Sequence, residues 1–367
     1  MMVLPLVSRI APQQYLSEEG AYDFLSEAIE KLFLKKIIFL HGEKSLHAAL
    51  PYLPDLQALP AEIVDFPFSG ECSEAEIKKL IQTIRATGAD ALIGLGGGKV
   101  LDTAKAAAYH AGNLPLILLP TLASNCAAWS ALSVIYAENG TSLGHRIYPK
   151  QANLVLIEPR VIAASPVRFF VAGIADTLAK WYETERLLRA AGDSSLAVIY
   201  ARQSARLCRD IPLQHAQQAV RAMRDQKVTD DWKLVMETTI MAGGLVGGFA
   251  DELGRATAAH SVHDALTTFS ETKHLLHGEK VAYGIILQLA LEKNQDEIEK
   301  LRPFYRSLQL PFSLADLNLA DLPEDGIREL AAQTVTPDKT IHLLPYSVTE
   351  EKVVEAIQSL ENLAVRQ

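Results

Sequence analysis

The stretch Gly94-Leu-Gly-Gly-Gly-Lys-Val-Leu-Asp-Thr-Ala-Lys105 is the part of the chain that indicates its fold most clearly. It follows an apolar, strand-like segment at residues 89–93 and leads into a helix-like segment at residues 100–111. Glycines at a strand-to-helix turn let the backbone come close to a bulky anion, and the helix start offers free N–H groups and the positive end of a dipole. The stretch therefore predicts a site for a phosphate or pyrophosphate group.

The spacing of these residues excludes two common phosphate-binding motifs. A P-loop requires Gly-x-x-x-x-Gly-Lys-Ser/Thr, but Ile93 stands at its first glycine and Val100 follows the lysine. The usual dinucleotide motif Gly-x-Gly-x-x-Gly is also absent, because Lys99 occupies its third glycine position. The alternative interpretation is a glycine-rich turn that binds no ligand.

The first part of the chain alternates between strand-like and helix-like segments. Ser73 is a good helix N-cap, and apolar residues recur on one face after it. The predicted strands are 36–40, 62–66, 89–93, 114–119 and 153–157, and the predicted helices between them include 73–87 and 100–111. This alternation predicts a parallel sheet covered on both faces, with ligands at the carboxyl ends of its strands.

The pattern changes near Glu158. Ser165-Pro166 is a typical helix start, and almost everything from there to Gln367 has helical spacing. The predicted helices are 167–189, 194–209, 214–224, 230–244, 251–269, 280–292 and 349–363, with 340–344 as a possible short strand. We therefore expect a Rossmann-like α/β nucleotide-binding domain at residues 1–160, an α-helical domain at residues 161–367, and a cleft between them.

Bulk composition narrows the class of protein. The formal net charge of −9 disfavours a nucleic-acid partner and an electrostatic hold on anionic membranes. No apolar run reaches the roughly 18 residues that span a membrane, and residues 1–10 lack the layout of a signal peptide. Three scattered cysteines do not make a disulfide framework. We expect a soluble, cytoplasmic protein that acts on a small molecule.

A group of histidines indicates a metal site. His260 and His263 share a helix face at i and i+3, and His277 follows just before the next apolar helix. Asp176 lies in an otherwise apolar helical run, where a carboxylate is costly unless it is paired or binds a cation. Imidazole nitrogens suit zinc, iron, nickel or copper. Two alternatives remain: the histidines are satisfied within the fold or lie on the surface, and Asp176 pairs with Lys180 one turn on.

These motifs together resemble the glycerol-dehydrogenase-like branch of the metal-dependent (iron-containing) alcohol dehydrogenase family, over most of the chain. The matching strings are SGECS (69–73), GLGGGKVLDTAK (94–105), PTLAS (120–124), SALSVIY (130–136), GIADTLAKWYE (173–183), AAHSVHDALT (258–267) and HGEKVAYG (277–284). The resemblance implies an N-terminal Rossmann-like domain, a C-terminal helical domain, and cofactor and metal in the cleft between them. It also implies a homo-oligomer.

The resemblance also assigns site residues. It implies that Asp176, His260 and His277 bind the metal, zinc more often than iron, and that His263 is a neighbour and a candidate proton relay. The implied contacts to the pyrophosphate and ribose are Gly96, Gly97, Gly98, Lys99 and Asp102. Thr121 and Ser124 would approach the cofactor from the end of the next strand, and Ser130, Leu132 and Tyr136 would line the nicotinamide side.

Two departures from the family pattern bear on specificity. Cys126 stands where glycerol dehydrogenases have an aspartate that meets the polyol hydroxyls, and Trp129 adds bulk nearby. A neutral thiol removes repulsion of an anionic substrate. The strings CAAW and LAKWYE resemble a hydroxycarboxylate dehydrogenase subgroup, so we expect a 2-hydroxy acid/2-oxo acid pair. Asn125, the metal or, more remotely, Lys280 would meet the substrate carboxylate; Cys126 as a neutral packing change is the alternative.

The second departure concerns the cofactor. Gly42 stands where an aspartate of the family favours NAD, which leaves room for a 2′-phosphate beside Lys44 and Ser45. Glu43 favours NAD(H) instead, because its carboxylate could take the place of the missing aspartate. We expect NADP(H) ahead of NAD(H).

The sequence thus predicts a metal-dependent NAD(P)(H) oxidoreductase that interconverts a secondary alcohol and a ketone. A glycerol dehydrogenase is the alternative. A lyase resembling dehydroquinate synthase and a metal-free nucleotide-binding relative are remoter ones.

Overall fold

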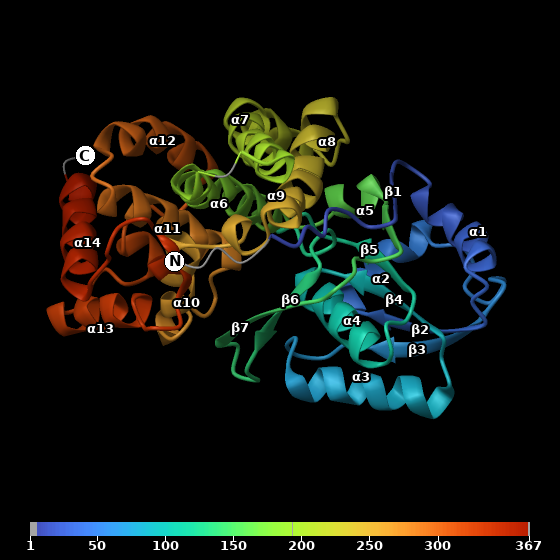
Figure 1. The fold of residues 1–367 in the computed structure, drawn as a ribbon. Helices are drawn as coiled ribbons and strands as arrows, with labels where there is room; N and C mark the ends of the chain where they lie inside the picture. The colour runs from blue at the N-terminus through green and yellow to red at the C-terminus, as the bar shows by residue number, and fades with distance from the viewer. Residues whose placement is uncertain (1–5, 193, 366–367) are drawn as a thin grey trace.

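A six-stranded, fully parallel sheet forms the N-terminal half of the computed structural model, which describes residues 6–192 and 194–365 (Figure 1). Its strand order is β1-β8-β5-β4-β2-β3. The strands are β1 (Gln14–Ser17), β2 (Lys36–His41), β3 (Glu62–Pro67), β4 (Ala91–Gly96), β5 (Leu116–Pro120) and β8 (Leu154–Ile157). Strand β4 is buried along its whole length, and its last residue, Gly96, pairs with Pro120 of β5. The glycine run therefore begins at the carboxyl edge of the sheet.

Helices cover both faces of this sheet, as the sequence predicts. Alternate residues of β2 point to opposite sides, so Ile38 belongs to the same buried cluster as Leu80 and Leu101, while Ile37 belongs to the cluster of Leu25. The first face carries α3 (Glu74–Thr87) and α4 (Gly98–His110), and the second carries α1 (Phe24–Lys31) and α2 (Glu43–Ala49). The short helix α5 (Pro159–Ala163) contributes residues to both buried clusters. Ser73 caps α3 as expected, since its side chain accepts from the backbone N–H of Glu76.

An antiparallel hairpin of β6 (Leu132–Tyr136) and β7 (Ser142–Ile147) lies outside the main sheet, and the sequence reading did not anticipate it. Buried Asp102 of α4 holds it: the carboxylate accepts from the backbone N–H of Val134 at 3.0 Å, and the backbone oxygen accepts from Ser133 at 2.7 Å. Figure 1 shows β7 beside the helical part of the molecule.

The C-terminal half is helical, as predicted. Its helices are α6 (Val167–Ala191), α7 (Leu196–Arg224), α8 (Asp230–Glu237), α9 (Gly243–Ala250), α10 (Ala258–Leu266), α11 (His277–Leu291), α12 (Gln295–Leu308), α13 (Glu324–Thr334) and α14 (Glu350–Val365). A π-helical turn, η3 (Thr238–Ala242), joins α8 to α9, and the 3-10 turn η4 (Asp251–Gly254) follows α9. In the described part of the chain, no helix is long and apolar enough to cross a membrane.

Several predicted elements differ in the structure. The expected strand 340–344 is wrong: residues Thr340–Leu343 form a 3-10 turn, in which the backbone N–H of Ile341 donates to the Ser261 side chain and not to a neighbouring strand. The predicted helix 251–269 is broken, because Asp251 has a φ of 49° and α10 begins at Ala258. The two helices predicted within 194–224 are one, α7, which runs through Pro212.

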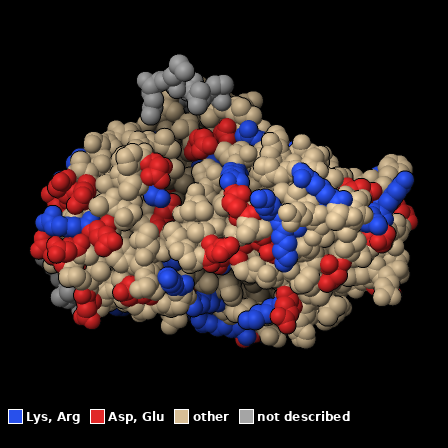
Figure 2. Space-filling view, turned by 90° about the horizontal axis from the view of Figure 1, so that it is seen from below, with Lys and Arg blue, Asp and Glu red and all other residues tan. Residues whose placement is uncertain are grey.

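Charges of both signs are mixed on the surface. Figure 2 shows Lys and Arg interspersed with Asp and Glu on the face that it presents. The net charge is −9, and the described residues of this face offer no broad basic patch.

Candidate active site

A cavity of about 580 Å³ lies between the glycine run and the helical half of the molecule. Residues from both halves line it, which places the predicted phosphate site and the predicted metal site in one space. The lining includes Gly97, Gly98, Lys99, Asp102, Ser124, Asn125, Cys126, Ser130, Leu132 and Tyr136 from the first half and Asp176, Lys180, Gly243, Gly247, Arg255, His260 and His277 from the second.

The glycine run forms a close-packed turn from β4 into α4. A Cβ atom on Gly96 would lie 2.6 Å from Val100 Cβ, and one on Gly98 would lie 2.7 Å from Asn125 Nδ2. Gly97 is the N-cap of α4 and has no capping side chain, so the first N–H groups of the helix lack an intrahelical partner, and both Gly97 and Gly98 line the cavity. This cradle suits a pyrophosphate.

The other residues predicted to bind the cofactor fall into two groups. Gly42, Gly96 and Thr121 do not line the cavity. Gly42 instead is the N-cap of α2, and Thr121 donates to Ser45 Oγ at 3.1 Å. Lys99 does line the cavity and pairs with Glu71 at 2.5 Å. Asp102 also lines it, but its carboxylate holds the β6–β7 hairpin and lies 2.7 Å from Lys105 Nζ.

Asp176, His260 and His277 converge from α6, α10 and the start of α11, with one ligand atom from each within 4.8 Å of the others. Asp176 Oδ1 lies 3.1 Å from His277 Nε2 and 3.4 Å from His260 Nε2. Glycines permit this convergence, because a Cβ on Gly278 would lie 1.8 Å from the backbone oxygen of Ala172. Helix α11 therefore begins directly against the backbone of α6.

Negative charge is concentrated around these ligand atoms. Burial raises the pKa of Asp176, but hydrogen bonds with His260 and His277 outweigh it and hold that pKa well below its usual range. Burial lowers the pKa of His260, yet the charge of Glu183 and the hydrogen bonds with Asp176 and Glu183 raise it to about 10. A set of one carboxylate and two imidazoles that draws in positive charge in this way suits a divalent cation such as zinc.

Glu183 orients His260. Its Oε2 lies 2.6 Å from His260 Nδ1, and its Oε1 accepts from the backbone N–H groups of Thr257 and His260 at 2.7 and 3.0 Å. With Nδ1 engaged, Nε2 faces Asp176, as in a carboxylate–histidine–metal arrangement. The sequence analysis gave Glu183 no role, although it lies seven residues after Asp176 and thus on the same face of α6.

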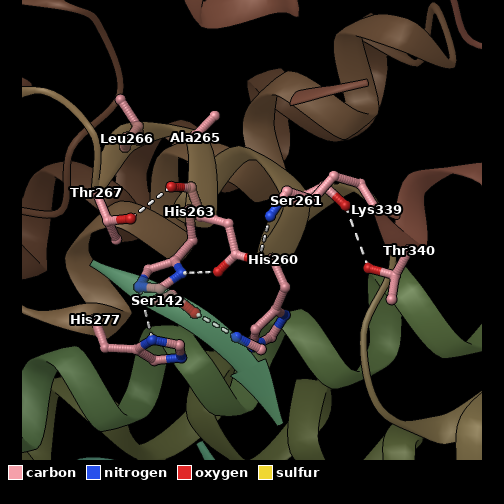
Figure 3. A network of polar contacts seen from close by, with 12 residues as sticks. Ser142, His260, Ser261, His263, Ala265, Leu266, Thr267, His277, Lys339 and Thr340 are labelled. Carbon is pink, nitrogen blue, oxygen red and sulfur yellow. Dashed lines mark hydrogen bonds and ion pairs between the residues drawn. The ribbon is translucent and has the colours of Figure 1, made fainter. Parts of the chain in front are cut away.

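His263 lies next to His277 (Figure 3). Unlike His277, it does not line the cavity. Its Nε2 is hydrogen-bonded to His277 Nδ1 at 2.9 Å, and its Nδ1 lies 3.1 Å from Asp264. Asp264 in turn pairs with Lys339 Nζ at 3.2 Å. Burial, with the nearby charge of His277, lowers the pKa of His263 to about 3. This chain of contacts fixes the ring of His277; a proton-relay role for His263 stays a prediction.

The two residues expected at the substrate side, Asn125 and Cys126, both line the cavity. Asn125 Oδ1 accepts from the backbone N–H of Ala127 at 3.0 Å, and Cys126 Sγ lies 3.3 Å from Ser130 Oγ. Trp129 does not line the cavity: it is buried, and its indole donates to the backbone oxygen of Ile10. Lys280 is also buried outside the lining.

Two cations in the lining had no predicted role in substrate binding. Lys180 does not hydrogen-bond to Asp176; it donates to the backbone oxygen of Arg255 at 2.9 Å. Arg255 directly follows the turn η4, and its Nη2 donates to Oδ1 of Asp251, the first residue of that turn, at 3.1 Å. The sequence marked Lys180 only as an ion-pair partner for Asp176, one turn away, and nothing in the spacing marked Arg255.

Comparisons with known proteins agree with this architecture. Residues 12–159 match the model of the family described as iron-containing alcohol dehydrogenase. The chain is 35% identical over 360 residues to hydroxycarboxylate dehydrogenase A of Escherichia coli (strain K12), covering 98% of each, and 38% identical to glycerol dehydrogenase of Citrobacter freundii, covering 81% of each. The crystal structure of a probable glycerol dehydrogenase from Sinorhizobium meliloti 1021 superposes with a TM-score of 0.88 at 30% identity, over 98% of this chain and 99% of that one.

Proposed function

The chain belongs to the iron-containing alcohol dehydrogenase family, in its glycerol dehydrogenase-like branch, and we propose that it interconverts a 2-hydroxy acid and a 2-oxo acid. As a member of this family it is an oxidoreductase that acts on CH–OH donors with a nicotinamide cofactor and a divalent metal. The finer choices of NADP(H) ahead of NAD(H), and of zinc ahead of iron, are part of the proposal.

The charge of the cavity lining is the observation that supports a substrate with a carboxylate. Of the described residues that line it, two have carboxylates: Asp176 belongs to the metal cluster and Asp102 holds the hairpin. Three lining residues are cationic, Lys99, Lys180 and Arg255, and Cys126 is neutral. A divalent cation would make the cavity more positive still. Such a site favours an anionic substrate over an uncharged polyol.

Three residues fit the metal. A cation held by Asp176, His260 and His277 would supply Lewis-acid polarisation of the carbon–oxygen bond of the substrate. Glu183 would keep His260 in the right tautomer, and His263 would do the same for His277, so both are positioning residues.

The glycine run fits the dinucleotide. The N-terminus of α4 and the Gly97–Gly98 backbone would hold the pyrophosphate, while Ser130, Leu132 and Tyr136 would form the wall at the nicotinamide. The cofactor supplies the hydride chemistry, and the protein supplies position and charge. The absence of an acid at Gly42, next to Lys44 and Ser45, supports NADP(H).

A glycerol dehydrogenase is the second candidate, because relatives with that name match at 35–38% identity. The discriminating experiment measures wild-type rates with 2-oxo acids, hydroxyacetone and glycerol, with each nicotinamide cofactor, before and after treatment with a metal chelator. We expect chelator-sensitive reduction of 2-oxo acids with NADPH in excess of NADH. Efficient oxidation of glycerol without reduction of 2-oxo acids would replace the proposal with the second candidate.

A further inference from the structure

Arg255 lies in the cavity wall contributed by the helical half. It directly follows η4, its side chain is 7% exposed, and it lines the same cavity as the metal cluster. A Cβ on Gly247 of α9 would lie 3.4 Å from Arg255 Nη1, and a Cβ on Gly243, one turn earlier, would lie 3.4 Å from Cys126 Cβ. The guanidinium and the Cys126 side chain therefore lie along one glycine stripe of α9, about one helical turn apart.

The charge of Arg255 is only partly neutralised. Its Nη2 donates to Asp251 Oδ1 at 3.1 Å, but the same oxygen also accepts from Arg9 Nη1 at 3.1 Å. One carboxylate thus serves two guanidinium groups. The buried Nε of Arg255 has no hydrogen-bond partner among the described residues. A buried cationic donor without an acceptor is costly, so the guanidinium is left under-bonded by the protein itself.

We propose that Arg255 binds the carboxylate of the substrate, an inference that rests on the proposed 2-hydroxy acid/2-oxo acid activity. A guanidinium offers a planar pair of donors that matches a carboxylate. The phosphates of a dinucleotide have their own cradle at α4, which belongs to the other half of the molecule. Lys180 is a less suitable anchor, because Asp176 and Glu183 act on its charge and its ammonium donates to the backbone of Arg255.

The same contacts assign a positioning role to Asp251. The residue has a φ of 49°, in the left-handed region that a non-glycine side chain rarely adopts. Its carboxylate is held by Arg9, whose N-terminal segment is fixed on α9 by a 2.7 Å hydrogen bond from Arg9 N–H to the oxygen of Gly248. Asp251 therefore holds the guanidinium against α9 from the side away from Cys126.

The test compares two three-carbon ketones that differ in charge: pyruvate, with a carboxylate, and hydroxyacetone, with a hydroxymethyl group. In the metal-loaded enzyme, Arg255→Gln should lower kcat/KM for pyruvate by about 30- to 100-fold, the effect of losing a charge-assisted hydrogen bond, and that for hydroxyacetone by less than about 5-fold. Arg255→Lys should recover part of the loss. Binding of oxamate, measured by calorimetry with cofactor present, should weaken in parallel.

Arg302→Gln is the matched control, because Arg302 is a partly buried arginine of α12 that pairs with Glu299, does not line the cavity and does not contact Arg255 or Asp251. It should leave the ratio of the two kcat/KM values within about 3-fold of wild type, since Arg255 keeps its charge. Equal losses for pyruvate and hydroxyacetone in both Arg255 variants, or no loss of oxamate binding, would overturn the assignment while leaving the proposed function intact. A wild-type enzyme that reduces no 2-oxo acid would overturn both.

Discussion

The Nδ1 atom of His260 lies 2.6 Å from Oε2 of Glu183, which is fully buried and bound to the backbone at the start of α10. A carboxylate in this position fixes the tautomer and the direction of a metal-binding imidazole. Glu183→Gln should therefore weaken retention of the metal by about 10- to 100-fold and lower turnover with it.

Metal content after dialysis against a graded chelator, measured by mass spectrometry, tests this prediction. Glu185→Gln is the control, because Glu185 lies on the same helix and pairs with Arg189 and Arg202 away from the cluster. Equal metal retention in the two variants would show that Glu183 does not support the site.

The neutral side chain of Cys126 should decide between anionic and uncharged substrates. Cys126→Asp would place a carboxylate beside Ser130 in the cavity wall, where it would repel a substrate carboxylate. We expect kcat/KM for 2-oxo acids to fall by about 10- to 100-fold, and that for glycerol to fall less or to rise. Cys126→Ser, which stays neutral, should keep the wild-type preference. A preference that is the same in both variants would exclude Cys126 as a determinant.

Gly278 should be essential for stability and for the position of His277. A Cβ at this residue would lie 1.8 Å from the backbone oxygen of Ala172, so Gly278→Ala must push α11 away from α6. We expect a loss of about 3 kcal/mol in the free energy of unfolding, measured with urea, and a loss of bound metal. Gly326→Ala on α13 is the control, because its new Cβ would meet side-chain atoms of Leu322 and Pro323 and not the backbone of another helix. Similar unfolding midpoints for the two variants would contradict the close contact.

Lys280 should make stability depend on pH. Burial lowers the pKa of its ammonium from the usual 10.5 to about 8. Between these values the unfolded chain binds a proton that the folded chain does not, so the contribution of Lys280 to stability rises with pH from about 8 to 10.5 and is least below 8. Lys280→Met should remove this rise. Urea midpoints of both proteins at pH 7.5 and 9.5 test it, and parallel changes in wild type and variant would contradict it.

Sequence predicts those parts of the site in which one physical requirement accounts for the type of residue at that position. Consecutive glycines between a buried strand and a helix predicted the turn at Gly97. His260, His277 and Asp176 came from the resemblance and from the cost of a carboxylate in an apolar helix. The alternation of strand-like and helix-like segments predicted the parallel sheet with helices on both faces.

The rest depends on tertiary contacts that local spacing does not record. Arg255 lines the cavity because the helical path is interrupted between α9 and α10. The apolar spacing of residues 251–269 predicted one continuous helix there and so did not indicate this interruption. The 340–344 segment has the apolar residues of a strand, yet its neighbour is the helix α10, so its backbone bonds to a serine side chain. The hairpin β6–β7 forms because Asp102 holds it from another element.

The proposed substrate preference is tested by one ratio: kcat/KM for oxidation of a 2-hydroxy acid over that for glycerol, measured with the zinc-loaded wild-type enzyme at one pH and with one cofactor. The cationic cavity wall and the neutral Cys126 predict that the best of a panel of 2-hydroxy acids exceeds glycerol by at least about 10-fold, and that a chelator abolishes both activities. A ratio in favour of glycerol, or a 2-hydroxy acid activity that survives removal of the metal, would contradict it.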